Sequence, residues 1–272
     1  MNLRRLLLVT SGLTVLTMVM GVYTAEFGAG LACEARWPLC DGAVYGLFPA
    51  NIPSFVEWFH RLLAMVTGFV ILGTAVVAWR RDADEIVKGG LALALVMLPI
   101  QIILGALTVT RYEVAILTAH FGTPTLILGG VTAAAVWSHR DVIGPTIPRL
   151  RRYLSVVVLG FPVLVVFTPR LVFVYSWIAQ MSYYILGLSI AGVLLSVALL
   201  ARDTPGTDSI FALESLLGAV IVVVALILGR LHFGDVGQLG IIGLTIVAVG
   251  LVLAAIRRLY RLERSGLVTS PG

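Results

Sequence analysis

The chain has 272 residues, of which 59% are hydrophobic and 12% are charged, and its formal net charge is +5. Soluble domains carry about 25% charged residues, so this composition excludes an ordinary soluble domain and indicates an integral membrane protein. The basic residues stand at the ends of hydrophobic segments, as they do in membrane proteins. The positive charge therefore does not indicate a nucleic-acid partner.

Eight segments are long and apolar enough to cross a membrane as helices. A spanning helix needs about 20 mostly apolar residues, and the segments that qualify are approximately 5–25, 55–79, 88–110, 113–137, 152–169, 173–200, 210–230 and 236–257. The first follows a basic tip, as in a cleaved signal peptide. Its apolar run is long enough to span, and no small-residue cleavage site follows directly, so we expect a retained helix. The predicted fold class is an all-α polytopic membrane protein with eight transmembrane helices.

Basic residues between the segments predict the orientation of the chain. They concentrate in one set of loops and ends: Arg4, Arg5, Arg80, Arg81, Lys88, Arg140, Arg149, Arg151, Arg152, Arg202, Arg257, Arg258, Arg261 and Arg264. The opposite loops carry few, such as Arg36 and Arg111. By the positive-inside rule, we expect a multi-pass protein of the plasma membrane with both termini in the cytoplasm. The loop that contains both cysteines would then lie outside.

The two halves of the chain are similar in sequence. Placing Trp58 over Trp177 also aligns Gly68 with Gly187 and Gly73 with Gly192. This predicts a duplicated four-helix unit, with an N-terminal bundle at 1–145 and a C-terminal bundle at 146–272. The same placement aligns His60 with Ala179 and Glu57 with Ser176, and placing TAHFG over VGQLG aligns His120 with Gln238. We therefore expect the first bundle to carry the chemistry and the second to be degenerate.

Two histidines, His60 and His120, lie inside hydrophobic segments. Polar and ionisable side chains are costly in the membrane and often functional there, and imidazoles from neighbouring helices can bind haem iron as axial ligands. The alternative is a pair of buried histidines that hydrogen-bond to neighbours. Zinc is a weaker alternative, because a zinc site usually needs three or four protein ligands. The pair at matching depth favours haem.

Glu57 stands three residues before His60 and Arg61 stands one residue after it. Residues three apart share a helix face, so Glu57 is either an interfacial carboxylate near the helix start or an acid–base group at the edge of a haem pocket. Arg61 can pair with Glu57 or with a haem propionate, or extend to the membrane interface. The residues alone leave these alternatives open.

Cys33 and Cys40 are the only cysteines, and both stand in one short loop on the predicted outer side. Thiols there are readily oxidised, so we expect a disulfide. A structural link is the preferred interpretation, and exchange with a partner thiol is the alternative.

Four runs together resemble the haem A synthase family, the CtaA/Cox15-type membrane proteins. They are GAGLACEARWPLCDG, EWFHRLLA, QIILGALTV and TAHF. The resemblance implies an oxidoreductase that converts haem O to haem A by successive hydroxylation of a ring methyl to a formyl group. It implies that His60 and His120 are axial ligands, that Glu57 is needed for turnover, and that Cys33 and Cys40 form the loop pair.

The sequence departs from the two-haem members of this family. Those proteins carry a second histidine pair that is assigned to a haem b, where this chain has Ala179 and Gln238. We therefore expect one haem, at the N-terminal bundle. The segment TAEFGAG also stands where TR-x-x-G-x-G is commoner. The implied partners are haem O as substrate, a haem O synthase, terminal oxidase assembly proteins, a further copy of the chain and an electron donor that the sequence does not identify.

Two other hypotheses remain beside the enzyme. One is a b-type membrane cytochrome that transfers electrons without changing its haem. The other is a haem-handling assembly factor or transporter without catalysis, which the degenerate second half favours. Glu57 beside a ligand favours the enzyme, because an electron carrier does not need that carboxylate.

Overall fold

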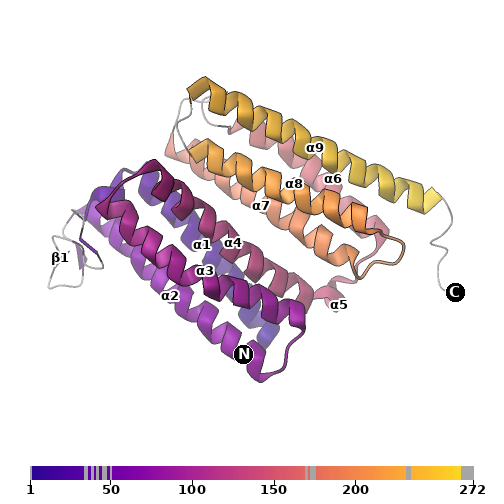
Figure 1. Ribbon diagram of the computed structural model, residues 1–272, viewed down its shortest axis with the longest axis horizontal. Coiled ribbons are helices and arrows are strands. Elements are labelled where there is room, and N and C mark those ends of the chain that lie inside the picture. Colours follow the sequence, from indigo (N-terminus) through magenta and orange to yellow (C-terminus); the bar gives the residue numbers. More distant parts are fainter. Residues whose placement is uncertain are drawn as a thin grey trace. The chain divides into compact units, whose positions relative to one another are not determined.

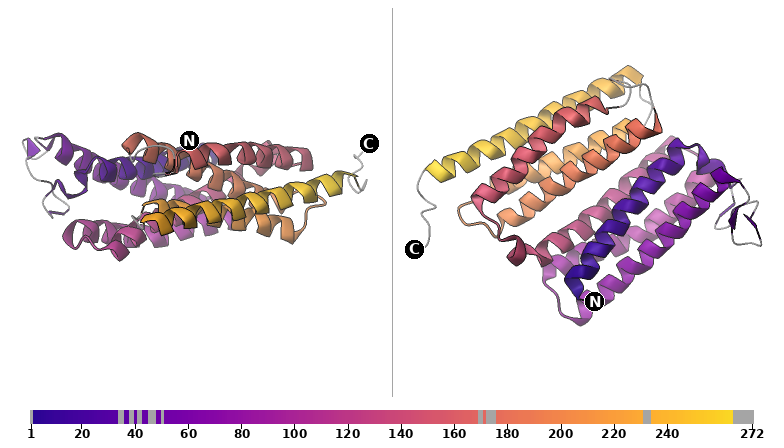
Figure 2. Two further views of the ribbon diagram at one scale, coloured as in Figure 1. Left: turned by 90° about the horizontal axis from the view of Figure 1, so that it is seen from above. Right: turned by 180° about the vertical axis from the view of Figure 1, so that it is seen from behind.

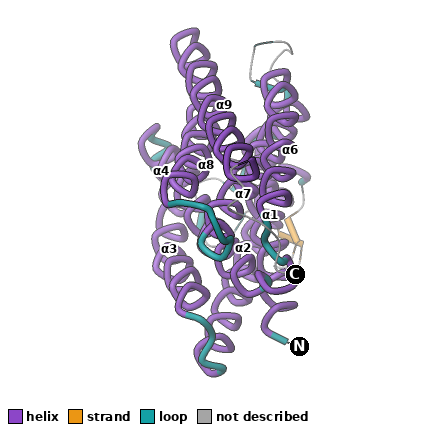
Figure 3. Tube along the Cα trace, turned by 90° about the vertical axis from the view of Figure 1, so that its right-hand side faces the viewer, coloured by secondary structure: helices purple, strands orange, loops and turns teal. Residues whose placement is uncertain are grey.

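The chain is almost entirely helical in the computed structural model (Figure 1). The structure describes residues 2–33, 36–37, 40, 43–44, 48–49, 51–168, 171, 176–230 and 234–264. The helices are α1 (Leu3–Glu26), α2 (Ile52–Arg80), α3 (Glu85–Thr110), α4 (Val114–Ser138), α5 (Arg140–Ile143), α6 (Ile147–Val166), α7 (Trp177–Ala201), α8 (Ser209–Arg230) and α9 (Gly234–Arg264), with a 3-10 turn, η1, at Ala29–Leu31. Strands β1 (Ala43–Val44) and β2 (Phe48–Pro49) form a small antiparallel pair, drawn in orange in Figure 3.

Seven of these helices are long and apolar enough to cross a membrane: α1, α2, α3, α4, α7, α8 and α9. Each predicted segment overlaps a helix in the described part of the chain, which confirms the all-α polytopic class. The eighth segment corresponds to α6, which is 20 residues long but carries Arg149, Arg151 and Arg152 near its start. Charged side chains are costly in hydrocarbon, so the predicted number of spans is approximate.

Side-chain caps fix where several helices begin. Asn51 accepts a hydrogen bond from the backbone N–H of Ser54 at 2.8 Å, and a proline stands in the first turn of α2. Asn2, Asp84 and Thr146 cap α1, α3 and α6 in the same way. Such side chains satisfy N–H groups that have no partner within the helix.

The chain divides into two compact units, and the first comprises Met1–Ala135 with Ser176–Met181. Helices α1 and α2 of this unit lie side by side (Figures 1 and 2) and are joined by two threonine pairs. The hydroxyls of Thr10 and Thr74 lie 2.7 Å apart, and so do those of Thr17 and Thr67. Thr17 stands seven residues after Thr10 in α1, and Thr67 stands seven residues before Thr74 in α2. The two contacts therefore fix one antiparallel register.

Helices α3 and α4 approach each other backbone to backbone in the same unit. A Cβ atom on Gly90 would collide with the carbonyl oxygen of Gly130, and the reverse also holds. Ala94 and Ala134 follow four residues after these glycines, so both helices use the small-xxx-small pattern of close membrane helix contacts. Only glycine fits at the crossing.

The second unit comprises Val136–Tyr175 with Ser182–Gly272. Its interior holds two buried tyrosines of α7, and both donate hydrogen bonds to backbone carbonyls of α8. The Tyr183 hydroxyl lies 3.1 Å from the oxygen of Ala225, and the Tyr184 hydroxyl lies 2.7 Å from that of Leu226. Ion pairs join other parts of this unit: Arg258 with Glu214, Arg151 with Glu263, and Arg140 with Asp203.

Candidate functional site

The first turns of α2 carry Glu57, His60 and Arg61, as the sequence predicts. Glu57 is only 7% exposed. The Nε group of Arg61 donates a hydrogen bond to Oε1 of Glu57 at 2.8 Å. The side chains of Arg61 and Glu57 are 15% and 9% exposed, respectively. Of the partners that the sequence leaves open for Arg61, the structure shows Glu57. The carboxylate is held on one side by a fixed cation.

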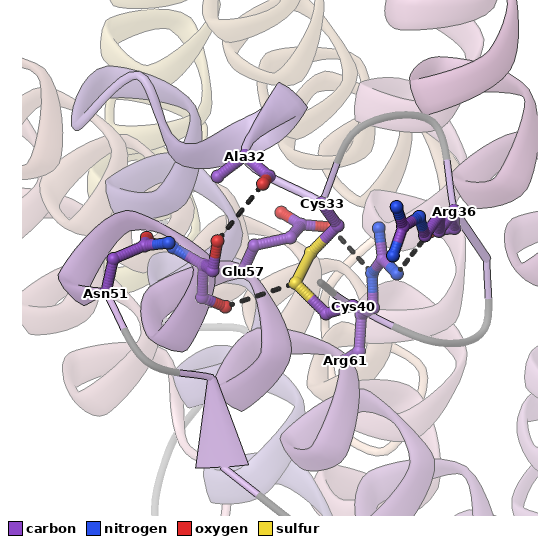
Figure 4. The surroundings of a disulfide bond; sticks show 8 residues. Ala32, Cys33, Arg36, Cys40, Asn51, Glu57 and Arg61 are labelled. Carbon is purple, nitrogen blue, oxygen red and sulfur yellow. Dashed lines mark hydrogen bonds and ion pairs between the residues drawn. A yellow bond between two sulfur atoms is a disulfide. The ribbon is translucent and has the colours of Figure 1, made fainter. Parts of the chain in front are cut away.

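The cysteine loop is fastened to this part of α2 (Figure 4). Cys33 and Cys40 form a disulfide with Cα atoms 4.5 Å apart, which confirms the predicted bond. Close by, the Nη1 group of Arg61 donates to the carbonyl oxygen of Arg36 at 2.9 Å. Ser54 binds the loop as well, because its hydroxyl donates to the carbonyl oxygen of Ala32 at 3.1 Å. Arg61 therefore joins the loop backbone to Glu57.

The imidazole of His60 lies against α1. A Cβ atom built on Gly21 would stand 3.0 Å from Cε1 of His60 and 3.3 Å from its Nε2. The Nδ1 atom of His60 is buried, and it has no hydrogen-bond partner among the described residues. The absent side chain of Gly21 provides the space for the ring.

His120 on α4 has an equivalent environment against α3. A Cβ atom on Gly105 would stand 3.2 Å from Cε1 of His120, and its Nδ1 is also buried without a partner in the described part of the chain. Pro124 lacks the N–H that would bind the carbonyl of His120 four residues earlier. The side-chain amide of Gln101 donates to that carbonyl instead, at 3.1 Å, so the proline bend is compensated.

The first unit contains all four residues that the sequence selects, Glu57, His60, Arg61 and His120. No group of three or more His, Cys, Asp or Glu ligands exists among the described residues, so a multi-ligand metal site is not formed there. Haem needs only axial ligands from the protein, because the porphyrin supplies four nitrogens. Two imidazoles from different helices, each beside a glycine, fit that requirement.

Sequence reasoning missed Gly21 and Gly105. A signal for them exists, since each begins a G-x-x-T run, GVYT in α1 and GALT in α3. Both runs end two residues before the last residue of their helix. A glycine inside a helix lowers helix propensity, so its presence at matched positions indicates a packing requirement.

Comparison with known proteins identifies the family of the chain. The family model described as cytochrome oxidase assembly protein, COX15-CtaA, matches residues 4–171. Among relatives, the heme A synthase of Bacillus pumilus is 30% identical over 138 residues, covering 49% of this chain and 44% of that protein. The heme A synthase of Alkalihalophilus pseudofirmus is 30% identical over 151 residues, covering 53% and 50%.

A second kind of relative carries a different name. The protoheme IX farnesyltransferase of Halobacterium salinarum is 34% identical over 122 residues, which cover 44% of this chain and 27% of that protein. The chain thus spans half or less of the length of each of these three relatives. No solved structure matches the chain. Because the family match covers more than half of its residues, the chain belongs to the COX15-CtaA family of cytochrome oxidase assembly proteins.

Proposed function

We propose that this chain is a haem A synthase, which oxidises one ring methyl group of haem O to a formyl group. The observation that carries the proposal is the pair of imidazoles from α2 and α4, together with the Glu57–Arg61 ion pair; the Nδ1 atom of each imidazole is buried and has no partner among the described residues. Relatives named heme A synthase support the reaction class.

The substrate haem would be held by His60 and His120. Its iron supplies redox chemistry when it is bound. The protein supplies position, because each imidazole rests on a neighbouring helix and α1 is locked to α2 by the threonine pairs.

The proposed reaction is two hydroxylations of one methyl group. Each consumes one dioxygen, two electrons and two protons, replaces one C–H bond by C–OH, and releases the second oxygen atom as water. The first gives the alcohol, and the second gives a geminal diol that loses water to become the aldehyde. The oxidant is dioxygen, and the reductant is a membrane-soluble two-electron donor such as a quinol.

Glu57 would act on protons and charge at the edge of this site. Each hydroxylation consumes protons, and a carboxylate at the site can relay them. A carboxylate also stabilises positive charge that develops on the reacting carbon. Arg61 holds one carboxylate oxygen at 2.8 Å, so it acts as the positioning residue for Glu57. The link from Arg61 to the Arg36 carbonyl extends this positioning to the disulfide loop.

One haem per chain is part of the proposal. Tyr183 and Tyr184 stand one turn after Ala179, which aligns with His60. Both tyrosines are at most 2% exposed, and their hydroxyls are bonded to carbonyls of α8. Filled space of this kind supports a C-terminal half that acts as a scaffold.

The location and partners follow from the same proposal. The disulfide supports an outer position for the cysteine loop, because such bonds persist in oxidising compartments. With eight spans, both termini would then be cytoplasmic, in the plasma membrane. The similarity to proteins named protoheme IX farnesyltransferase supports an enzyme that farnesylates haem as the supplier of the substrate. The proteins that assemble the terminal oxidase would receive the product.

The test is expression of the full chain in a host that makes haem O and lacks haem A, followed by extraction and chromatography of the pigments. Haem A or its hydroxylated precursor is expected. Glu57→Ala should keep bound haem and lose product, whereas Glu113→Ala, an exposed carboxylate near the start of α4, should change neither. Bound haem B with no product would favour the b-type cytochrome. Unchanged product in Glu57→Ala would refute the role of Glu57.

A further inference from the structure

In both helix pairs of the first unit, a glycine on one helix makes room for an imidazole on the other. In the first pair, Gly21 of α1 faces His60 of α2, and in the second pair Gly105 of α3 faces His120 of α4. Each glycine stands five residues before the end of its helix, Glu26 in α1 and Thr110 in α3. The glycine thus comes from the helix that precedes the histidine in both pairs.

The contact is made in the same way in both places. The atom nearest to the added Cβ is the Cε1 of the ring, at 3.0 Å for Gly21 and 3.2 Å for Gly105. The next atoms are also ring atoms of the same histidine. Neither glycine has a positive φ, so the backbone conformation does not require glycine. The space taken by the ring explains both residues.

The register of α1 against α2 keeps the first contact in place. The threonine pairs Thr10–Thr74 and Thr17–Thr67 are separated by seven residues on each helix. One further step of seven brings Thr24 of α1 to the level of His60 of α2. Gly21 lies one turn from Thr24 and therefore close to this level. Because sliding α1 along α2 would break both hydroxyl pairs, the register keeps Gly21 beside His60.

We propose that Gly21 and Gly105 are a matched pair of positioning residues that set the ring orientation of His60 and His120 for haem. This inference rests on the proposed haem site and adds residues that do not touch the haem iron. Side chains behind metal ligands commonly orient them, and here the absence of a side chain does so. A methyl group added at Gly21 or Gly105 would push the facing imidazole ring away from the helix that carries the glycine, and would rotate the ring.

The test uses four alanine variants of the full chain. Gly21→Ala and Gly105→Ala alter the two contacts, while Gly12→Ala on α1 and Gly89→Ala on α3 are matched controls, because a Cβ at either control meets nothing within 4 Å. Haem affinity is measured by titration in detergent, and ring orientation by the low-spin electron paramagnetic resonance spectrum of the oxidised haem. Each test variant should bind haem at least tenfold more weakly and show shifted g values. Both controls should match the unmodified chain.

A second measurement needs no haem. In the haem-free protein with isotope-labelled histidine, Gly21→Ala should shift the nuclear magnetic resonance signals of His60 and leave those of His120, and Gly105→Ala should do the reverse. In a His60→Ala background, adding Gly21→Ala should leave thermal stability unchanged, because no ring remains to displace.

The outcomes separate the two proposals. An unmodified chain that takes up no haem overturns the proposed function, and with it the role of the glycines toward haem. A chain that binds haem equally well in all four variants, with unchanged spectra, overturns the positioning role alone. A loss of stability from Gly21→Ala that persists in the His60→Ala background would assign Gly21 to ordinary helix packing and also overturn it.

Discussion

The ion pair between Glu57 and Arg61 should be the strongest polar interaction at the site, and a double-mutant cycle measures it. The variants are Glu57→Gln, Arg61→Met and the two together, which remove each charge with little change in side-chain length. The pair is joined at 2.8 Å, with side chains 9% and 15% exposed. Hydrogen bonds to charged groups contribute about 1.5–3 kcal/mol, whereas exposed i,i+4 pairs contribute about 0.3–0.5 kcal/mol. Burial of this pair places the expected coupling near 2 kcal/mol, roughly thirtyfold in the unfolding constant.

The assay is reversible unfolding of the haem-free chain in mixed detergent micelles, followed by circular dichroism. A matched control cycle uses Lys88 and Glu85 on α3, which form a 2.6 Å ion pair with the Glu85 side chain 88% exposed. That pair should couple much more weakly, because solvent screens exposed charges. Equal coupling in the two cycles would show that burial does not strengthen the Glu57–Arg61 pair, and the argument for a firmly positioned carboxylate would fail.

Three further predictions concern the packing that surrounds the site. A cycle of Thr17→Val and Thr67→Val should give a coupling of about 0.6 kcal/mol, the average for neutral hydrogen bonds between membrane helices, and a value near zero would remove the register argument. Gly90→Ala should destabilise by about 1–3 kcal/mol because its Cβ collides with backbone, whereas Gly89→Ala, with open space, should be neutral or stabilising in the same unfolding assay. Gln101→Leu should destabilise the chain by about 1–3 kcal/mol, because it leaves the partly buried carbonyl of His120 without a donor; an unchanged midpoint would show that water replaces the amide.

The helices could be predicted from sequence because membrane spans depend on hydropathy over long windows. Their ends were less predictable, since ends depend on local chemistry. Segment 152–169 corresponds to Ile147–Val166, which begins five residues earlier because Thr146 caps its first turn. Segment 236–257 corresponds to Gly234–Arg264, which continues past the apolar run through a stretch with several arginines. The short helix Arg140–Ile143 has no hydropathy signal and was not predicted.

The site residues whose side chains are costly in a membrane could be predicted from the sequence, whereas the glycines of the site could not. His60, His120 and Glu57 are recognisable because such side chains are expensive in a membrane. Gly21 and Gly105 are not, because glycine is common in membrane helices and 28 glycines are spread through the chain. Only the pairing of each glycine with one imidazole, which needs coordinates, separates these two from the rest. The spacing of seven residues between threonines on both helices is visible in the sequence, but which threonines pair could be identified only from the register of α1 against α2.

Both units place an aromatic ring beside a glycine, but the polar atoms of these rings differ in their hydrogen bonds, and this difference bears on where haem can bind. In the second unit, a Cβ on Gly229 would meet the ring of Tyr183, and the hydroxyl of that tyrosine is satisfied by the Ala225 carbonyl. In the first unit, the space beside Gly21 and Gly105 is taken by imidazoles whose Nδ1 atoms lack partners among the described residues. A buried polar group without a partner costs about 1–3 kcal/mol, so the haem-free first unit carries a penalty that the tyrosine-filled interior avoids. Among the described residues, a pair of imidazoles with buried Nδ1 atoms occurs in the first unit, so stabilisation by added haem should arise there.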